Sequence, residues 1–183
     1  MSFTFPLVAR HVNYSNDGDL LLMPSATSSF HDYDFLQGHH RVRHKKLKER
    51  LNQCTEWIDI EGMKDTEKIL GGIGNTEKHS LKNVDGNRVE AIALRLFDTS
   101  TKLWSLYWAD NVTGKLDPPL QGSFEGNLGV FFGKDYFEGE EILVQFQYDR
   151  SNPEEPVWGQ AFSNDKGRRW EWNWFMFYKR IAV

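Results

Sequence analysis

The sequence lacks the residues from which covalent and metal crosslinks are built. Cys54 is the only cysteine among 183 residues, so an intramolecular disulfide and a thiolate cluster for zinc or iron–sulfur are excluded. A single thiol also fits a reducing compartment. The chain needs no crosslink, because one domain of this length buries roughly 70% of the surface that its unfolded form exposes.

Long apolar runs are missing as well. The first ten residues contain neither a basic segment nor the continuous apolar core of a secretory signal peptide. No later stretch approaches the roughly 18 apolar residues of a membrane-spanning helix. We therefore expect a soluble, cytoplasmic protein with no membrane partner.

A strong excess of positive charge is also absent. The 22 Lys and Arg residues are outnumbered by 26 Asp and Glu residues, which gives a net charge of −4, so we expect no nucleic-acid partner. Residues 41–50 are a local exception, with six basic residues and one acidic residue. This run could be a phosphate-binding or membrane-surface patch, but we prefer a solvated strand edge whose lysines discourage edge pairing.

Aromatic residues, by contrast, are abundant. The 13 Phe, 7 Trp and 6 Tyr residues make up 14% of the chain, which excludes a disordered chain or a fibrous rod. Residues 1–29 contain no Trp and end in a run of small polar residues. We therefore expect an N-terminal arm over residues 1–29 and one compact domain over residues 30–183. The arm is expected to lie on its own domain; the alternatives are that it closes one end of a cavity or reaches a second subunit.

Turn-forming residues recur about every ten residues from Phe30 onward, a spacing typical of strands and turns. The runs between them are rich in aromatic and β-branched residues. They predict strands at 39–47, 55–61, 67–70, 75–80, 89–97, 103–109, 121–125, 128–133, 142–148, 157–163 and 170–179. Because an open sheet of this size would leave two long unpaired edges, we expect an all-β domain that closes into a barrel or stacks as a sandwich.

Alternation along each strand predicts which side chains share a face. In the last strand, Trp170, Trp172, Trp174, Met176 and Tyr178 should point one way, and Glu171, Asn173, Phe175, Phe177 and Lys179 the other. Both faces are partly apolar, more than a sheet with one solvated face requires. We expect one face to line a cavity and the other to be covered by an arm, a helix or another subunit; the alternative is that Trp and Tyr lie at the rim.

Four segments resemble a known superfamily. Residues 31–40 resemble the opening of a calycin barrel, where a Gly-x-Trp motif starts the first strand, although Gly38-His39-His40 has histidine in place of tryptophan. Residues 94–108, 114–124 and 158–176 resemble a family of uncharacterised bacterial lipocalin-like proteins, a domain of unknown function. The resemblance implies a single antiparallel lipocalin-like (calycin) β-barrel of about ten strands around a pocket, with no established activity.

A barrel of about eight to ten strands has room for side chains or for one small ligand, so its cavity is the expected site. The predicted ligand-binding residues are Arg41, Arg43, Arg95, Trp104, Tyr107, Trp108, Gln160, Trp172, Asn173 and Trp174. A buried arginine keeps its charge, so Arg95 inside the barrel would imply a carboxylate or phosphate on an apolar ligand. The alternative is that these polar residues are solvated or form a satisfied internal network.

Cofactor and hydrolytic motifs are weak. On a strand, His40 and His44 would lie about 13 Å apart, too far for one metal ion. Haem-binding calycin relatives ligate iron from a histidine near the C-terminal strand, and residues 170–183 contain none, so haem is a minor alternative and we predict no metal or cofactor. No Gly-x-Ser-x-Gly motif is present, and residues 71–75 are expected to form a hairpin with positive φ.

Three classes of function follow. The first is a binding protein that holds a small apolar or amphipathic ligand, anionic if an arginine orients it, in the barrel cavity. The second is a calycin-type enzyme that acts on a small molecule in the same cavity through an Arg, Tyr and Glu or His set. The third is a homo-oligomeric interaction module, such as a homodimer, whose aromatic outer face is an interface.

Overall fold

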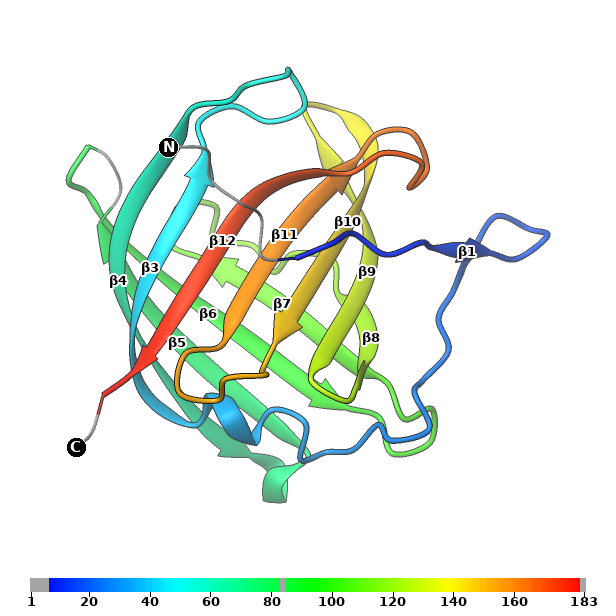
Figure 1. The fold of residues 1–183 in the computed structure, drawn as a ribbon, viewed down its shortest axis with the longest axis horizontal. Helices are drawn as coiled ribbons and strands as arrows, with labels where there is room; N and C mark the ends of the chain where they lie inside the picture. The colour runs from blue at the N-terminus through cyan, green and yellow to red at the C-terminus, as the bar shows by residue number, and fades with distance from the viewer. Residues whose placement is uncertain (1–6, 83–84, 182–183) are drawn as a thin grey trace.

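The computed structural model of the chain describes residues 7–82 and 85–181. Within these residues, ten antiparallel strands form a closed barrel in the order β10-β11-β12-β3-β4-β5-β6-β7-β8-β9 (Figure 1). Each strand pairs with its neighbours in sequence, and the pairing of β12 with β3 closes the ring. Closure leaves no free sheet edge. The prediction of an all-β, lipocalin-like antiparallel barrel is confirmed.

The barrel strands are β3 (Gly38–Leu47), β4 (Trp57–Ile69), β5 (Gly74–Lys82), β6 (Arg88–Phe97), β7 (Trp104–Asp110), β8 (Leu120–Glu125), β9 (Leu128–Phe137), β10 (Glu140–Asp149), β11 (Val157–Ser163) and β12 (Glu171–Arg180). A small hairpin of β1 (Asn13–Tyr14) and β2 (Leu20–Leu21) precedes them. The two 3-10 helices are η1 (Asp34–Leu36) and η2 (Leu70–Gly72). At η2, Gly71 and Gly72 have φ of 67° and 99°, which confirms the predicted positive φ.

One predicted break is wrong. The runs expected at 55–61 and 67–70 form the single strand β4, and Gly62 lies inside it rather than at a turn. A Cβ atom at Gly62 would lie 3.0 Å from Nε2 of His44 and 3.1 Å from Cβ of Leu81. The glycine therefore permits the close approach of two interior side chains. In the sequence, a glycine with this role looks the same as a glycine at a turn.

A β-bulge in β12 corrects the predicted alternation of the last strand. The register between β11 and β12 shifts at Gln160 and Ala161, which pair with Trp174 and Trp172, respectively. The extra residue is Asn173, whose Oδ1 accepts a hydrogen bond from Nε2 of Gln160 at 2.9 Å inside the barrel, while Trp174 packs against the interior cluster. Because a bulge interrupts the two-residue period, Trp172 lies on the outer face with Phe175.

The N-terminal arm covers the outer aromatic face. Figure 1 shows its described part, from residue 7 onward, crossing the outside of the sheet over β9 and β10. The Gln145 side chain accepts a hydrogen bond from the backbone N of Arg10 and donates one to its carbonyl, at 2.8 and 2.9 Å. Leu7 is buried against Trp172 and Phe175, and Val12 is buried against the outer face of β9 and β10. The arm, whose residues 1–6 lie outside the described residues, thus lies on its own domain.

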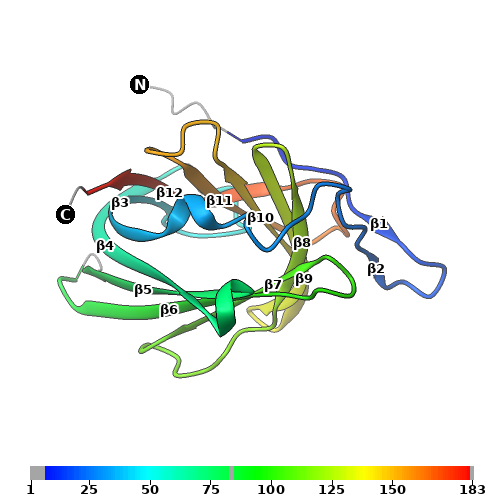
Figure 2. The same cartoon turned by 90° about the horizontal axis from the view of Figure 1, so that it is seen from below.

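The segment after the hairpin closes one end of the barrel (Figure 2). Tyr33 is 1% exposed and makes edge contacts with Trp104, Phe124 and Tyr148, with ring centres 4.8, 5.1 and 5.3 Å apart. Leu36 of η1 is fully buried in the same cluster. We call this the plugged end. The boundary expected at residue 30 therefore falls within one continuous segment that lies on the barrel and then seals it.

Candidate functional site

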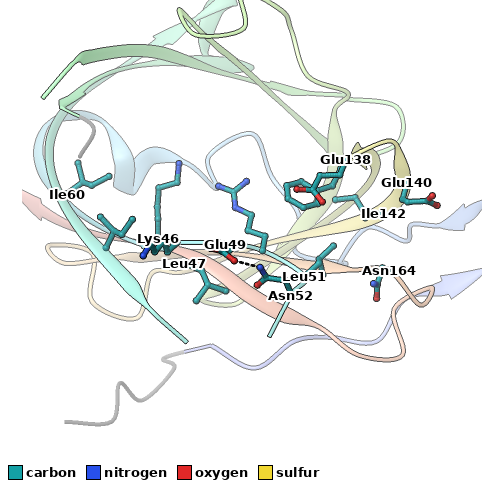
Figure 3. Close-up of a pocket in the computed structure, with 14 residues that line it drawn as sticks. Lys46, Leu47, Glu49, Leu51, Asn52, Ile60, Glu138, Glu140, Ile142 and Asn164 are labelled. Carbon is teal, nitrogen blue, oxygen red and sulfur yellow. Dashed lines mark hydrogen bonds between the residues drawn. The ribbon is translucent and has the colours of Figure 1, made fainter. Parts of the chain in front are cut away.

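The end of the barrel opposite Tyr33, here called the open end, contains a cavity of about 720 Å³ (Figure 3). Its wall is formed by the end of β3 and the loop that follows it, the start of β4, and the turn between β9 and β10. Aliphatic and aromatic side chains make up much of this wall; they are Leu51, Ile58, Ile60, Phe137 and Ile142. The volume lies within the range of small-molecule sites, about 300–1,000 Å³.

Charged side chains are arranged by depth in this open-end cavity. Lys46 and Arg50 are half-buried, whereas Glu138 and Glu140 are exposed at the rim. In Figure 3, Lys46 extends from β3 toward the middle of the pocket. Exposed Lys48 is already paired, with Nζ 2.8 Å from Oε2 of Glu56. The deeper polar wall is therefore cationic.

Lys46 and Arg50 are held by rings rather than by carboxylates. Nζ of Lys46 lies 3.9 Å from the centre of the Trp174 ring, and Cζ of Arg50 lies 5.4 Å from that of Phe162. Within the described residues, neither makes a salt bridge or a side-chain hydrogen bond. Burial, and next the charge of Arg50, lower the pKa of Lys46 from 10.5 to about 8.

Tryptophan and histidine rings lie beneath the cavity. The Trp174 ring contacts Trp158 and Trp108 edge-on, with centres 5.4 and 5.9 Å apart. Its Nε1 donates a hydrogen bond to Nδ1 of His44 at 3.2 Å. Burial, with smaller contributions from His79 and Lys46, lowers the pKa of His44 to about 3. His44 is therefore neutral at neutral pH and can accept this bond.

A buried ionic network lies deeper in the barrel and centres on Glu77, which is 1% exposed. Its Oε2 lies 2.8 Å from Nζ of Lys64, and its Oε1 lies 3.0 Å from Nη2 of Arg95 and 2.6 Å from Nε2 of His79. Although burial alone would raise the pKa of Glu77, the charges of Arg95 and Lys64 hold it well below its ordinary value. One carboxylate therefore serves two cationic side chains.

This network changes the meaning of Arg95. The prediction had placed Arg95 in the interior as a possible anchor for an anionic ligand, and the residue is indeed inside, 2% exposed. Its guanidinium, however, is bound by Glu77, by Oδ1 of Asn75 at 2.8 Å and by the Tyr148 hydroxyl at 3.1 Å, and it lies 5.0 Å from the ring of the Tyr33 plug. Arg95 thus belongs to an internal network at the plugged end and implies nothing about a ligand.

Of the other predicted residues, five lie inside the barrel and four lie on its outer face. Trp108 and Trp174 lie together beneath the cavity, Gln160 and Asn173 bond to each other in the interior, and Trp104 lies at the plugged end beside Tyr33.

The remaining predicted residues lie on the outer face of the barrel. Arg41 and Arg43 are exposed, because they alternate with the buried Val42 and His44. Tyr107 points outward between the inward-facing Leu106 and Trp108, and Trp172 is covered by the arm. These four residues are not placed to contact a ligand in the open-end cavity.

The basic run at residues 41–50 was also misread. It is not a strand edge, because β3 is hydrogen-bonded to β12 on one side and to β4 on the other. The run instead divides by alternation, with Arg41 and Arg43 outside and Lys46 inside. The alternation of Val42, His44 and Lys46 along one face was the signal that could have identified the cavity cation; nothing comparable pointed to Glu77 or Lys64.

Comparison with known proteins adds no family to this description. No protein-family model matches the chain, and a search of the curated proteins found no match. Within residues 7–82 and 85–181, no three His, Cys, Asp or Glu side chains are grouped to hold a metal ion. No helix in the described part of the chain could span a bilayer. Fold and site together define a lipocalin-like barrel with one plugged end and one open end.

Proposed function

We propose that this protein binds one small apolar or amphipathic molecule in the open-end cavity of its lipocalin-like barrel. The observation that carries the proposal is the difference between the two ends. Tyr33 and Leu36 are buried in one end, whereas the other end contains a cavity of about 720 Å³ whose wall is partly apolar. A concave apolar site with a few polar groups at fixed positions is the usual form of a small-molecule site.

Binding is preferred to catalysis because of where the titratable groups lie. An acid or base must reach the reacting atoms of a bound molecule. The strongest candidates, Glu77 and His79, are 1% and 4% exposed and are engaged with each other at 2.6 Å. The cavity itself supplies an apolar wall and two cations, which are sufficient for binding.

The third class, an interaction module, loses its main support. The outer aromatic face suggested an interface between subunits as long as it lacked a cover. Leu7, Val12 and the backbone around Arg10 supply that cover from within the same chain. A homodimer therefore stays a prediction.

A neutral fluorescent probe tests the proposed function. We expect N-phenyl-1-naphthylamine to bind the wild-type protein saturably, with one probe per chain. Ile60→Trp fills the cavity wall and should weaken binding at least about tenfold, which corresponds to about 1.4 kcal/mol. Met23→Trp is the matched control, because Met23 is 83% exposed in the segment after β2. Circular dichroism verifies that both variants fold; absence of saturable binding, or equal binding by the two variants, contradicts the proposal.

A further inference from the structure

Two half-buried cations share the wall of the open-end cavity. Lys46 ends β3 and Arg50 lies in the following loop, and both line the cavity. Each is half-buried, and the charge of Arg50 disfavours that of Lys46. Within the described residues, neither has a carboxylate within salt-bridge distance. Like charges in a partly desolvated site are unfavourable unless a counter-charge completes them.

Three carboxylates that line the cavity, Glu49, Glu138 and Glu140, are exposed. Two less exposed carboxylates that act on the pair are engaged elsewhere. Asp110 favours the charge of Lys46, but its Oδ2 accepts a hydrogen bond from Nε1 of Trp108, and its Oδ1 accepts from Thr113. Glu171 favours the charge of Arg50, but its Oε1 accepts from the backbone N of Leu51 at 2.7 Å. These groups moderate the positive charge from a distance and leave the donors of both cations free to bind another acceptor.

The deeper interior has no spare negative charge either. Below the cavity, Glu77 is shared between Lys64 and Arg95. Two interior N–H donors on the strands around Trp174 also lack an acceptor among the described residues; they are Nε1 of Trp158 and Nδ2 of Asn173. Both residues are almost completely buried. The half-buried cations Lys46 and Arg50 thus have no buried counter-charge among the described residues, since the carboxylates that line their cavity, Glu49, Glu138 and Glu140, are exposed.

We propose that the ligand of this protein carries a single oxyanion head group, such as a carboxylate, held by Lys46 and Arg50 at the mouth of the barrel. This inference rests on the proposed function and names the chemical class of its ligand. Arginine offers a planar fork of donors and lysine a compact point charge, so the two oxygens of one carboxylate can engage both. The apolar body of the ligand then packs against Ile58, Ile60 and Ile142.

Matched ligands that differ only in the head group test this inference. Decanoate, methyl decanoate and 1-decanol are each titrated against the neutral probe, at concentrations below those at which they form micelles. We expect decanoate to displace the probe from the wild-type protein at about one-tenth of the concentration that the neutral ligands need, because charge-assisted hydrogen bonds to one anion are worth about 1.5–3 kcal/mol.

Substitutions then assign the effect to the pair. Lys46→Gln and Arg50→Gln should each weaken decanoate binding about tenfold and leave 1-decanol binding unchanged. Lys45→Gln is the matched control, because Lys45 is the neighbouring lysine of β3 but points outward, with Nζ 2.9 Å from Oδ2 of Asp59. It should leave the binding of both ligands unchanged.

The possible outcomes separate the two proposals. Equal binding of decanoate and 1-decanol by the wild-type protein overturns the anionic head group and leaves the binding cavity intact. An equal loss of decanoate binding in Lys45→Gln, or a parallel loss of 1-decanol binding in Lys46→Gln and Arg50→Gln, also overturns it. Failure of the probe and of every ligand to bind overturns the proposed function itself.

Discussion

A lysine in β3 or the loop after it takes its role from the face of the strand on which it lies. Lys45 points outward, with Nζ 2.9 Å from Oδ2 of Asp59. Lys46, the next residue, points inward and stacks on the Trp174 ring. Lys48 lies at the rim and is paired with Glu56. Three neighbouring side chains of identical chemistry therefore differ in burial and in partner.

The amine of Lys46 should react faster than that of Lys48 with an acylating reagent at pH 8. Burial and Arg50 lower the pKa of Lys46 to about 8, so about half of its amines are neutral and nucleophilic at that pH. The hydrogen bond and the charge of Glu56 raise the pKa of Lys48, which keeps that amine almost fully protonated. Peptide mapping after a short pulse of acetic acid N-hydroxysuccinimide ester measures both rates in one sample.

The reactivity of Lys46 should rise as the pH increases from 6 to about 9 and then level off, because the neutral fraction is nearly complete about one pH unit above a pKa of about 8. The rate at Lys48 should still be rising at pH 10. Equal rates at the two lysines over this range would contradict the environment described for Lys46.

At this scale the sequence predicted candidates for the interior but not which face of each strand looks inward. Six of the ten predicted site residues lie inside, among them Trp108, Trp174 and Asn173, and the other four lie on the outer face. Arg95 is also inside, but its part in a network depends on Glu77, Lys64 and Tyr148, which lie on three other strands. Alternation along one strand carries no information about which charges meet across the barrel. For that reason the deep network was missed, and an arginine bound to it was taken for a ligand anchor.

Among the elements, the N-terminal arm has the clearest energetic role. It replaces water over the outer faces of β9 to β12, where Trp172 and Phe175 are buried against Leu7. Its backbone is held by side chains of β10, since Gln145 binds Arg10 and Nε2 of Gln147 donates to the carbonyl of Val8 at 2.8 Å. The outward-facing side chains of Gln145 and Gln147 thus hold the arm by hydrogen bonds to its backbone.

Val12→Asp should release the arm, because it places a charge where Val12 is buried against Phe132 and Leu143. Trypsin should then cleave after Arg10 at least about tenfold faster than in the wild-type protein, since local opening exposes the bond. Val8→Asp is the matched control, because Val8 is 76% exposed in the same arm, and its cleavage rate should match the wild type. Equal protection of Arg10 in both variants would contradict the docking.

The elements were largely predictable, and the exceptions share one cause. Gly-rich turns and aromatic or β-branched runs placed the barrel strands close to their observed bounds, because turn chemistry is local. The bulge at Asn173 and the uninterrupted path of β4 through Gly62 are decided by neighbouring strands. The bulge depends on Gln160 and the path of β4 depends on His44, and both of these residues lie on a neighbouring strand. No local sequence pattern predicts either feature.

For the molecule as a whole, the network around Glu77 connects three neighbouring strands, β4, β5 and β6, to β10 on the other side of the barrel. It links β4 through Lys64, β5 through Glu77 and His79, β6 through Arg95, and β10 through Tyr148. Glu77 lies on the side of the barrel next to the plug, because Nζ of Lys64 also donates to the carbonyl of Leu36 at 3.1 Å. Charge balance at this point is therefore coupled to closure of the plugged end.

Glu77→Gln should destabilise the folded protein by about 3–5 kcal/mol, because it leaves Lys64 and Arg95 buried without a counter-charge. Glu67→Gln is the matched control on the outside of β4; its pair with Lys78 is exposed on both sides and should contribute less than about 1 kcal/mol. Urea denaturation of the two variants measures the difference. A loss of similar size in both would mean that the network adds little to the stability of the barrel.

The pairing of β12 with β3 has a consequence for the order of events as the chain is made. His40 pairs with Arg180, and the carbonyl of Val8 meets Gln147, 139 residues further along the chain. The ring can therefore close, and the arm can dock, only after the C-terminal strands have been synthesised. Contacts between distant parts of a chain slow folding, so refolding is expected to take milliseconds to seconds. Until the ring closes, the unpaired strands are the part of the molecule most prone to aggregation.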